Sequence, residues 1–155
     1  MHRVGVLPFD IRSGDMALLF VTSQTRGRWI LPKGWIKKNE SHEAACEREA
    51  FEEAGVHGTV LSDFPITTVI SRQTDQGLED IVVTYYPLLV HEQTSKWPER
   101  KKRERHWVLF KDAKKIVHRE DFFDLIQRFE ELQPWIIEAA EDYKLQQKEA
   151  LKLVR

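Results

Sequence analysis

The stretch REAFEEAG (Arg48–Gly55) places three glutamates and one arginine within six positions and then ends in a glycine. A helix turns about 100° per residue, so Glu49, Glu52 and Glu53 would share one face. Like charges at these spacings repel one another unless a cation lies between them. Hard divalent cations such as Mg²⁺ bind clustered carboxylate oxygens well. The stretch taken alone is consistent with a metal-binding helix face or with a solvated acidic helix.

The neighbouring residues define the helix that carries this stretch. Ser41 has the side chain of an N-cap, and Glu43 suits the positive end of the helix dipole. Gly55 is the residue expected just past a helix C-terminus. We therefore predict a helix from about His42 to Ala54.

The rest of the chain reads as short strands followed by helices. We expect a loop over residues 33–40 and a short helix over 111–118. Asp121 is expected to cap a helix over 122–132, and Pro134 to begin a separate final helix. The predicted strands are 4–9, 16–22, 59–61, 66–71, 81–90 and 106–110, and residues 29–31 form a short apolar piece that Pro32 ends. Strands around one early helix, with helices at the end, predict a mixed α/β fold.

Length and composition set further limits. The chain has 155 residues, which suits a single domain over 1–155 with a C-terminal helical extension over about 121–155. With a net charge of −1, the chain lacks the overall positive potential that would attract nucleic acid. No apolar run in it is long enough to span a membrane. Cys46 is the only cysteine, which excludes an intrachain disulfide. We expect a soluble, cytoplasmic protein whose final helix packs on the domain or on a second subunit of a homodimer.

A longer pattern surrounds the acidic stretch. Seven residues follow the order G-x5-E-x7-R-E-A-x-E-E-x-G-V, namely Gly34, Glu40, Arg48, Glu49, Glu52, Glu53 and Gly55, with Ala50 and Val56 at the two apolar positions. This order matches the Nudix box completely, so the chain strongly resembles the Nudix hydrolase family. The resemblance implies a mixed β-sheet sandwiched between α-helices. It also implies hydrolysis of a nucleoside diphosphate linked to another group, or of a related pyrophosphate, and it favours the metal-binding interpretation of the glutamates.

The resemblance also implies a role for each residue of the box. Glu49 and Glu53 would be the main Mg²⁺ ligands, with Mn²⁺ as a possible substitute. Glu52 would be a further ligand or the residue that activates water. The Gly34 region would offer a backbone carbonyl to the metal. Arg48 would orient the glutamates, and Glu40 would support the loop.

The general base is left open by the sequence. Many family members place an acid directly before the tryptophan of a later strand, whereas His106 precedes Trp107 here and Glu104 is the nearest acid. Positions 104 and 106 of a strand point the same way. The candidates are therefore Glu52, Glu104 and His106, and an exposed strand end without a catalytic role is the alternative for the last two.

Basic residues near the box suggest a substrate with many phosphates. Five of the six residues from Arg100 to Arg105 are basic, and phosphates prefer charge-assisted donors such as the arginine fork. The alternative for such a run is a solvated surface loop. The candidate substrate-binding residues are Ser23, Arg26, Arg28, Lys33, Lys101, Arg103 and Arg105.

The layout resembles one branch of the family, the diphosphoinositol polyphosphate phosphohydrolases. The resemblance rests on residues 28–32, the box helix through Thr59, Trp97 before the basic run, and the segment from Trp107 to Val117. It implies a small-molecule polyphosphate substrate, either a diphosphoinositol polyphosphate or a diadenosine polyphosphate such as Ap5A or Ap6A. The alternatives are a Nudix hydrolase of ADP-ribose, a modified nucleoside triphosphate or capped RNA, and a Nudix module that binds a ligand without catalysis.

Overall fold

The computed structural model describes residues 2–24, 27–117 and 120–154. Three helices are present in this part of the chain: α1 (His42–Ala54), α2 (Phe110–Ile116) and α3 (Glu120–Leu153). The strands are β1 (Arg3–Arg12), β2 (Asp15–Thr22), β3 (Trp29–Ile30), β4 (Lys33–Trp35), β5 (Val56–Val60), β6 (Ile66–Thr74), β7 (Gly77–Gln93) and β8 (Arg105–Leu109).

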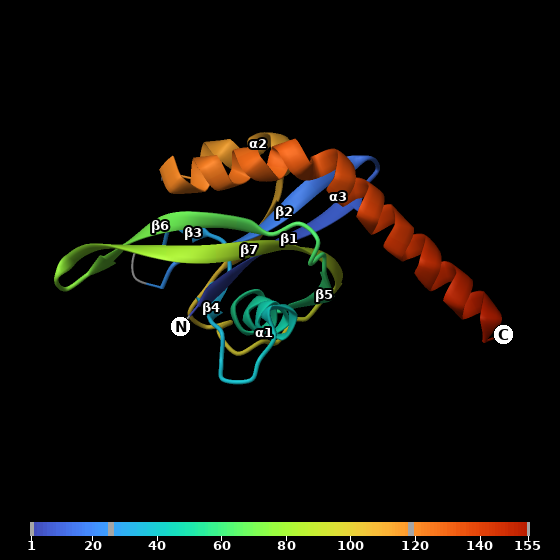
Figure 1. Ribbon diagram of the computed structural model, residues 1–155, viewed down its shortest axis with the longest axis horizontal. Coiled ribbons are helices and arrows are strands. Elements are labelled where there is room, and N and C mark those ends of the chain that lie inside the picture. The colour runs from blue at the N-terminus through green and yellow to red at the C-terminus, as the bar shows by residue number, and fades with distance from the viewer. Residues whose placement is uncertain (1, 25–26, 118–119, 155) are drawn as a thin grey trace.

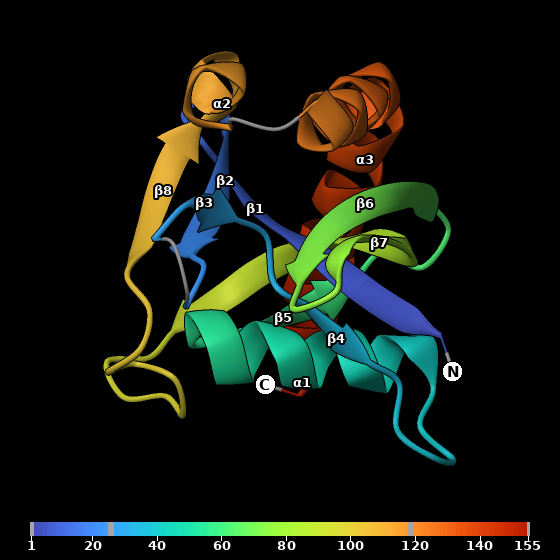
Figure 2. The ribbon, with the colours of Figure 1, turned by 90° about the vertical axis from the view of Figure 1, so that its left-hand side faces the viewer.

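All of these strands belong to one mixed sheet. Its main path runs β3-β2-β1-β7-β5, while β4 pairs with β1, β6 with β7 and β8 with β2. The β1–β7 pair is parallel and the other pairs are antiparallel. Helix α1 covers one face of the sheet, and α2 with the first part of α3 covers the other (Figures 1 and 2). The predicted class, a mixed sheet between helices with additional C-terminal helices, is confirmed.

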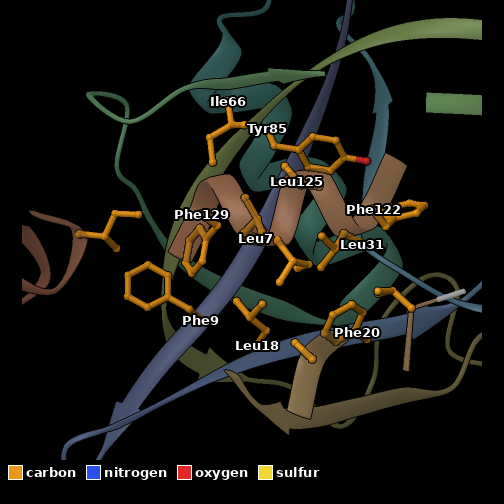
Figure 3. Close-up of a cluster of buried hydrophobic side chains, with 14 of the residues drawn as sticks. Leu7, Phe9, Leu18, Phe20, Leu31, Ile66, Tyr85, Phe122, Leu125 and Phe129 are labelled. Atoms are coloured by element: carbon orange, nitrogen blue, oxygen red, sulfur yellow. The ribbon is translucent and has the colours of Figure 1, made fainter. Parts of the chain in front are cut away.

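Side-chain alternation along the strands creates a separate core on each face. On β1, Leu7 and Phe9 point into the larger core beneath α3, where they pack with Phe129 (Figure 3). Val4 and Val6 point the other way, into a smaller core under α1. The smaller core fixes α1 against the sheet, and therefore fixes the face that carries the glutamates.

The ends of α1 are those that the sequence predicts. The Ser41 hydroxyl accepts a hydrogen bond from the Ala44 backbone N–H at 3.0 Å. Gly55 ends the helix in the left-handed region with φ 67°, and its N–H bonds the Ala50 and Phe51 carbonyls. The cap and the glycine stop together hold the acidic segment in a fixed helical register.

Ser41→Ala should lower the free energy of unfolding by about 1 kcal/mol, because the Ala44 N–H loses its side-chain partner. Urea unfolding would measure the change, with Ser41→Asp as the matched variant that keeps an acceptor. Equal stability of the alanine and wild-type proteins would show that the cap contributes nothing.

The structure corrects two of the sequence predictions. The segment predicted as a loop contains β4, which pairs with the start of β1 through Arg3↔Trp35 and Gly5↔Lys33. The two predicted C-terminal helices are one helix, α3, which begins before Asp121 and contains Pro134. Phe129 and Ile136 are fully buried on either side of the proline. We attribute the continuity of the helix to this packing, which offsets the backbone hydrogen bond that proline cannot donate.

The final turns of α3 run past the sheet and away from the body of the molecule (Figure 1). Leu145 and Leu151 are exposed there. In the described part of the chain, no helix combines the length and apolar character needed to cross a membrane.

Candidate active site

Two of the three glutamates in the stretch Arg48–Gly55 are buried. Glu49 and Glu53 are 8% and 4% exposed, whereas Glu52 is only partly covered. One carboxylate oxygen of Glu53 accepts a hydrogen bond from the Lys33 backbone N–H at 3.0 Å. Its other oxygen accepts one from Arg103 Nη2, also at 3.0 Å. Helix α1, strand β4 and the basic loop between β7 and β8 (residues 94–104) thus meet at the Glu53 side chain.

Arg48 links the other acidic residues. Its Nε and Nη2 donate to the two carboxylate oxygens of Glu40 at 2.8 and 2.9 Å. Its Nη1 lies 2.6 Å from a Glu49 oxygen and 3.5 Å from a Glu52 oxygen. Nη2 also donates to the Trp35 carbonyl at 2.9 Å. Arg48 therefore has the contacts of an orienting residue, and its hydrogen bond lowers the pKa of Glu40 to about 2.

Gly34 lies directly against the site. A Cβ at this position would collide with the Glu49 carboxylate. Only glycine lets the β4 backbone approach the carboxylate this closely. The Gly34 backbone is therefore near the predicted metal ligands, as the box implies.

Burial raises the pKa of both inner carboxyls, those of Glu49 and Glu53. Removal from water raises the pKa of Glu49, despite the adjacent Arg48 guanidinium. For Glu53 the same desolvation raises the pKa to about 8, and Arg103 opposes it in part. A cation placed between these carboxylates would favour their ionised forms.

The donor set suits a hard divalent cation, because it consists of carboxylate oxygens on one helix face beside a backbone approach at Gly34. Within residues 2–24, 27–117 and 120–154, no three His, Cys, Asp or Glu side chains already converge as a metal site. Arg48 and Arg103 hold the carboxylates instead. Glu49, Glu52 and Glu53 are the side chains that could hold a metal at this site.

The predicted substrate-binding residues have different surroundings. Arg103 binds Glu53, Glu99 and the Thr22 carbonyl. Arg105 does not bond the glutamate carboxylates but donates to the Ala54 and Thr94 carbonyls. Lys101 is exposed on the same loop.

The remaining predicted residues lie before the box or at its start. The Ser23 hydroxyl accepts a hydrogen bond from the Arg28 N–H at 3.0 Å. Lys33 brings its backbone N–H to Glu53. Arg26 lies outside the described residues. Phosphate binding by each of the seven residues stays a prediction.

The strand register separates His106 from the box glutamates. His106 pairs with Phe20, whose side chain points into the core beneath α3, while Trp107 pairs with Leu19 on the α1 face. The His106 ring lies 5.7 Å from that of Trp29. Glu104 precedes β8, and its backbone bonds Thr22. Glu52 lies on α1 with Glu49 and Glu53, so the geometry favours it among the three candidate bases.

Sequence reasoning missed one acidic residue near the site, Glu99. Its carboxylate accepts hydrogen bonds from Gln24 Nε2 at 2.7 Å and from Arg103 Nε at 3.1 Å. Its negative charge contributes to the raised pKa of both Glu49 and Glu53. No local pattern marks it, because it lies in a mostly basic loop and reaches the site only through the fold.

Comparison with known proteins agrees with this geometry. The family model of the NUDIX domain matches residues 1–129. Nudix hydrolase 12, mitochondrial, of Arabidopsis thaliana is 34% identical over 110 residues, covering 68% of this chain and 54% of the relative. Diphosphoinositol polyphosphate phosphohydrolase 3-alpha of Mus musculus is 30% identical over 117 residues, covering 74% and 68%. The chain spans 54% to 65% of the length of three Arabidopsis Nudix hydrolases that it matches.

Solved structures share the fold at lower identity. The C. elegans Ap4A hydrolase has a TM-score of 0.65 at 19% identity, with 85% of this chain and 97% of that one covered. The M. smegmatis Nudix hydrolase RenU also has a TM-score of 0.65, at 23% identity, with 87% of each chain covered. The matched NUDIX model covers the sheet, α1 and the start of α3. This chain therefore belongs to the NUDIX domain family.

Proposed function

We propose that this protein is a divalent-metal-dependent Nudix hydrolase that cleaves phosphoanhydride bonds of diphosphoinositol polyphosphates, diadenosine polyphosphates such as Ap5A and Ap6A, or both. The observation that carries the hydrolytic part is the arrangement of Glu49, Glu52 and Glu53 on one face of α1, beside Gly34 and Arg48. The substrate class rests on the similarity to the mouse diphosphoinositol polyphosphate phosphohydrolase and on the basic loop.

Each glutamate of the site has a separate role in the proposed reaction. Glu49 and Glu53, with a backbone carbonyl of the Gly34 region, would hold Mg²⁺, for which Mn²⁺ could substitute. When bound, the metal neutralises phosphate oxygens, polarises phosphorus and makes water more acidic. Glu52, the most exposed of the three glutamates, would accept a proton from the attacking water. The water oxygen forms a bond to one phosphorus in line as the anhydride P–O bond breaks, and the second phosphate leaves.

The basic loop would bind the remaining phosphates of the substrate. Arg100, Lys101 and Lys102 are exposed at its tip, on the segment that also contacts Glu52 and Glu53. Arginine and lysine there can approach phosphates with charge-assisted hydrogen bonds. A small-molecule polyphosphate is the partner that we propose. The homodimer and the cytoplasmic location expected from the sequence stay predictions.

One observation favours a second candidate function. Arg103 and Arg105 are engaged with protein groups, which leaves fewer free cations for a highly phosphorylated ligand. A Nudix hydrolase of another nucleoside diphosphate-linked compound with few phosphates, such as ADP-ribose or a modified triphosphate, would need fewer of them. A binding module without catalysis is less favoured, because it has no need to keep Arg48 with all three glutamates.

The test is product analysis after incubation with Mg²⁺ and Ap6A, a diphosphoinositol pentakisphosphate or ADP-ribose, with EDTA and Glu52→Gln as controls. We expect metal-dependent cleavage of at least one of the first two. Combined alanine replacement of Arg100, Lys101 and Lys102 should raise the KM for these substrates at least tenfold and change that for ADP-ribose much less. Cleavage of ADP-ribose alone would transfer the assignment to the second candidate. Tight binding of a substrate without turnover would favour the binding module.

A further inference from the structure

The C-terminal turn of α1 carries Glu52 and Glu53 and ends in backbone carbonyls that have no partner within the helix. Residues 94–105, which are the loop after β7 and the first residue of β8, supply partners to these carbonyls. The Glu52 carbonyl accepts from the Glu99 N–H at 3.0 Å, and the Glu53 carbonyl from Trp97 Nε1 at 3.1 Å. The Ala54 carbonyl accepts from Arg105 Nη1 at 3.0 Å, and Gly55 from the Thr94 N–H at 2.8 Å.

Negative charge accumulates at the last turn of α1 and would destabilise it without the neighbouring loop. The negative end of the helix dipole coincides with the Glu52 and Glu53 side chains. The last turn of α1, all of whose residues the structure describes, contains no basic residue. Arg105 places a guanidinium on the carbonyls, and Arg103 places a second one on the Glu53 carboxylate. The loop thus supplies the cations that the helix end lacks.

Packing fixes the position of Arg105. Its guanidinium carbon lies 3.9 Å above the centre of the Trp97 ring, and its Nη2 donates to the Thr94 carbonyl at 2.7 Å. Gly55 allows this approach, because a Cβ there would lie 2.7 Å from both Arg105 Nη1 and Trp97 Cδ2. The indole ring, the guanidinium and the helix end form one interlocked unit.

We propose that Trp97 and Arg105 are positioning residues, which set the geometry of the metal-binding glutamates by holding the backbone of the last turn of α1. This inference rests on the proposed function, in that the glutamates bind a divalent metal. Metal affinity depends on ligands held within a fraction of an ångström. Arg105, which the sequence suggested as a phosphate ligand, acts in this account through Glu52 and Glu53.

The variants Trp97→Phe and Arg105→Met distinguish an effect on metal binding from a general loss of stability. Phenylalanine keeps an aromatic ring beneath Arg105 but removes the donor to the Glu53 carbonyl. Methionine keeps much of the bulk of Arg105 but removes its donors and charge. Lys96→Ala is the matched control, since its exposed side chain lies on the same segment and has no proposed role in binding. The measurements are Mn²⁺ affinity, by titration calorimetry or by the paramagnetic resonance of free Mn²⁺, and the unfolding temperature in EDTA.

We expect Arg105→Met to weaken Mn²⁺ binding about 10- to 100-fold, the usual loss when the groups that orient metal ligands are removed. Trp97→Phe should weaken it about fivefold, as expected for one lost hydrogen bond, with an unfolding temperature close to that of the wild type. Lys96→Ala should bind Mn²⁺ as the wild type does.

Two results would overturn the inference. The first is Trp97→Phe binding Mn²⁺ within twofold of the wild type. The second is an affinity loss in both variants that follows their loss of stability. If Arg105→Met does not fold, Trp97→Phe decides the question alone. A folded wild-type protein that binds no Mn²⁺ would contradict the proposed function itself, which is a different outcome from the first two.

Discussion

Glu52→Gln is expected to lower turnover by about 10²- to 10⁴-fold, the range over which general acid–base catalysis contributes. Glutamine keeps the size of the side chain but cannot accept a proton from water at neutral pH. We propose Glu52 for this role because Glu49 and Glu53 are buried and paired with Arg48 and Arg103, whereas Glu52 lies 3.5 Å from Arg48 and remains partly exposed. The measurement is kcat with the preferred substrate in Mg²⁺, with KM expected to change little.

Glu47→Gln is the matched control for this experiment. Glu47 lies on the same helix, and its side chain is exposed. It should retain wild-type turnover, and both variants should have the circular dichroism spectrum of the wild type. A folded Glu52→Gln protein with turnover within tenfold of the wild type would exclude Glu52 as the proton acceptor. Glu99, the acid that Arg103 connects to Glu53, would then be the next residue to replace.

The sequence predicted the box helix well because its signals are local. The Ser41 cap, the Gly55 stop and the glutamate spacing all lie within one stretch of chain, and each corresponds to a contact in the structure. Arg48 lies between Glu40, Glu49 and Glu52, which are separated from it by eight residues or fewer. Local propensity and tertiary packing agree here, which is the condition under which sequence reasoning succeeds.

The two wrong secondary-structure predictions, at β4 and α3, both arise from contacts between residues that are distant in sequence. Strand β4 exists because Lys33–Trp35 pairs with the start of β1, and nothing within the segment itself predicts that pairing. Helix α3 continues through Pro134 because buried residues hold both halves on the sheet. In both cases tertiary structure overrides the local signal.

Sequence reasoning also could not predict which groups the basic side chains of the basic loop bind. A run of positive charge near a phosphate-cleaving motif suggests phosphate binding. The C-terminal carbonyls of a helix bind arginine as well, and Arg105 lies against the carbonyl of Ala54, 51 positions away in sequence. Charge alone cannot distinguish these two partners. The number of free cations at the site could therefore be counted only from the structure.

Glu53→Gln should make the metal-free protein more stable at pH 8, although it removes a predicted metal ligand. Burial raises the pKa of Glu53 from its ordinary value of 4.5 to about 8, so ionisation of this carboxyl opposes folding. The penalty is absent below about pH 4.5, grows as the pH rises, and is complete above about pH 8. Glutamine cannot ionise and still offers an oxygen to the Lys33 N–H or to Arg103.

The expected gain at pH 8 is on the order of 4 kcal/mol, since each pKa unit corresponds to about 1.4 kcal/mol and the raised pKa already includes the attraction of Arg103. Urea unfolding in EDTA at pH 5 and pH 8 measures this, with Glu47→Gln as the exposed control. The gain should nearly vanish at pH 5. With saturating Mg²⁺ the wild type should be more stable than Glu53→Gln, because the metal binds the wild-type fold more tightly and stabilises it accordingly. A wild-type protein that is the more stable of the two at pH 8 in EDTA would instead show that Arg103 fully compensates the buried charge.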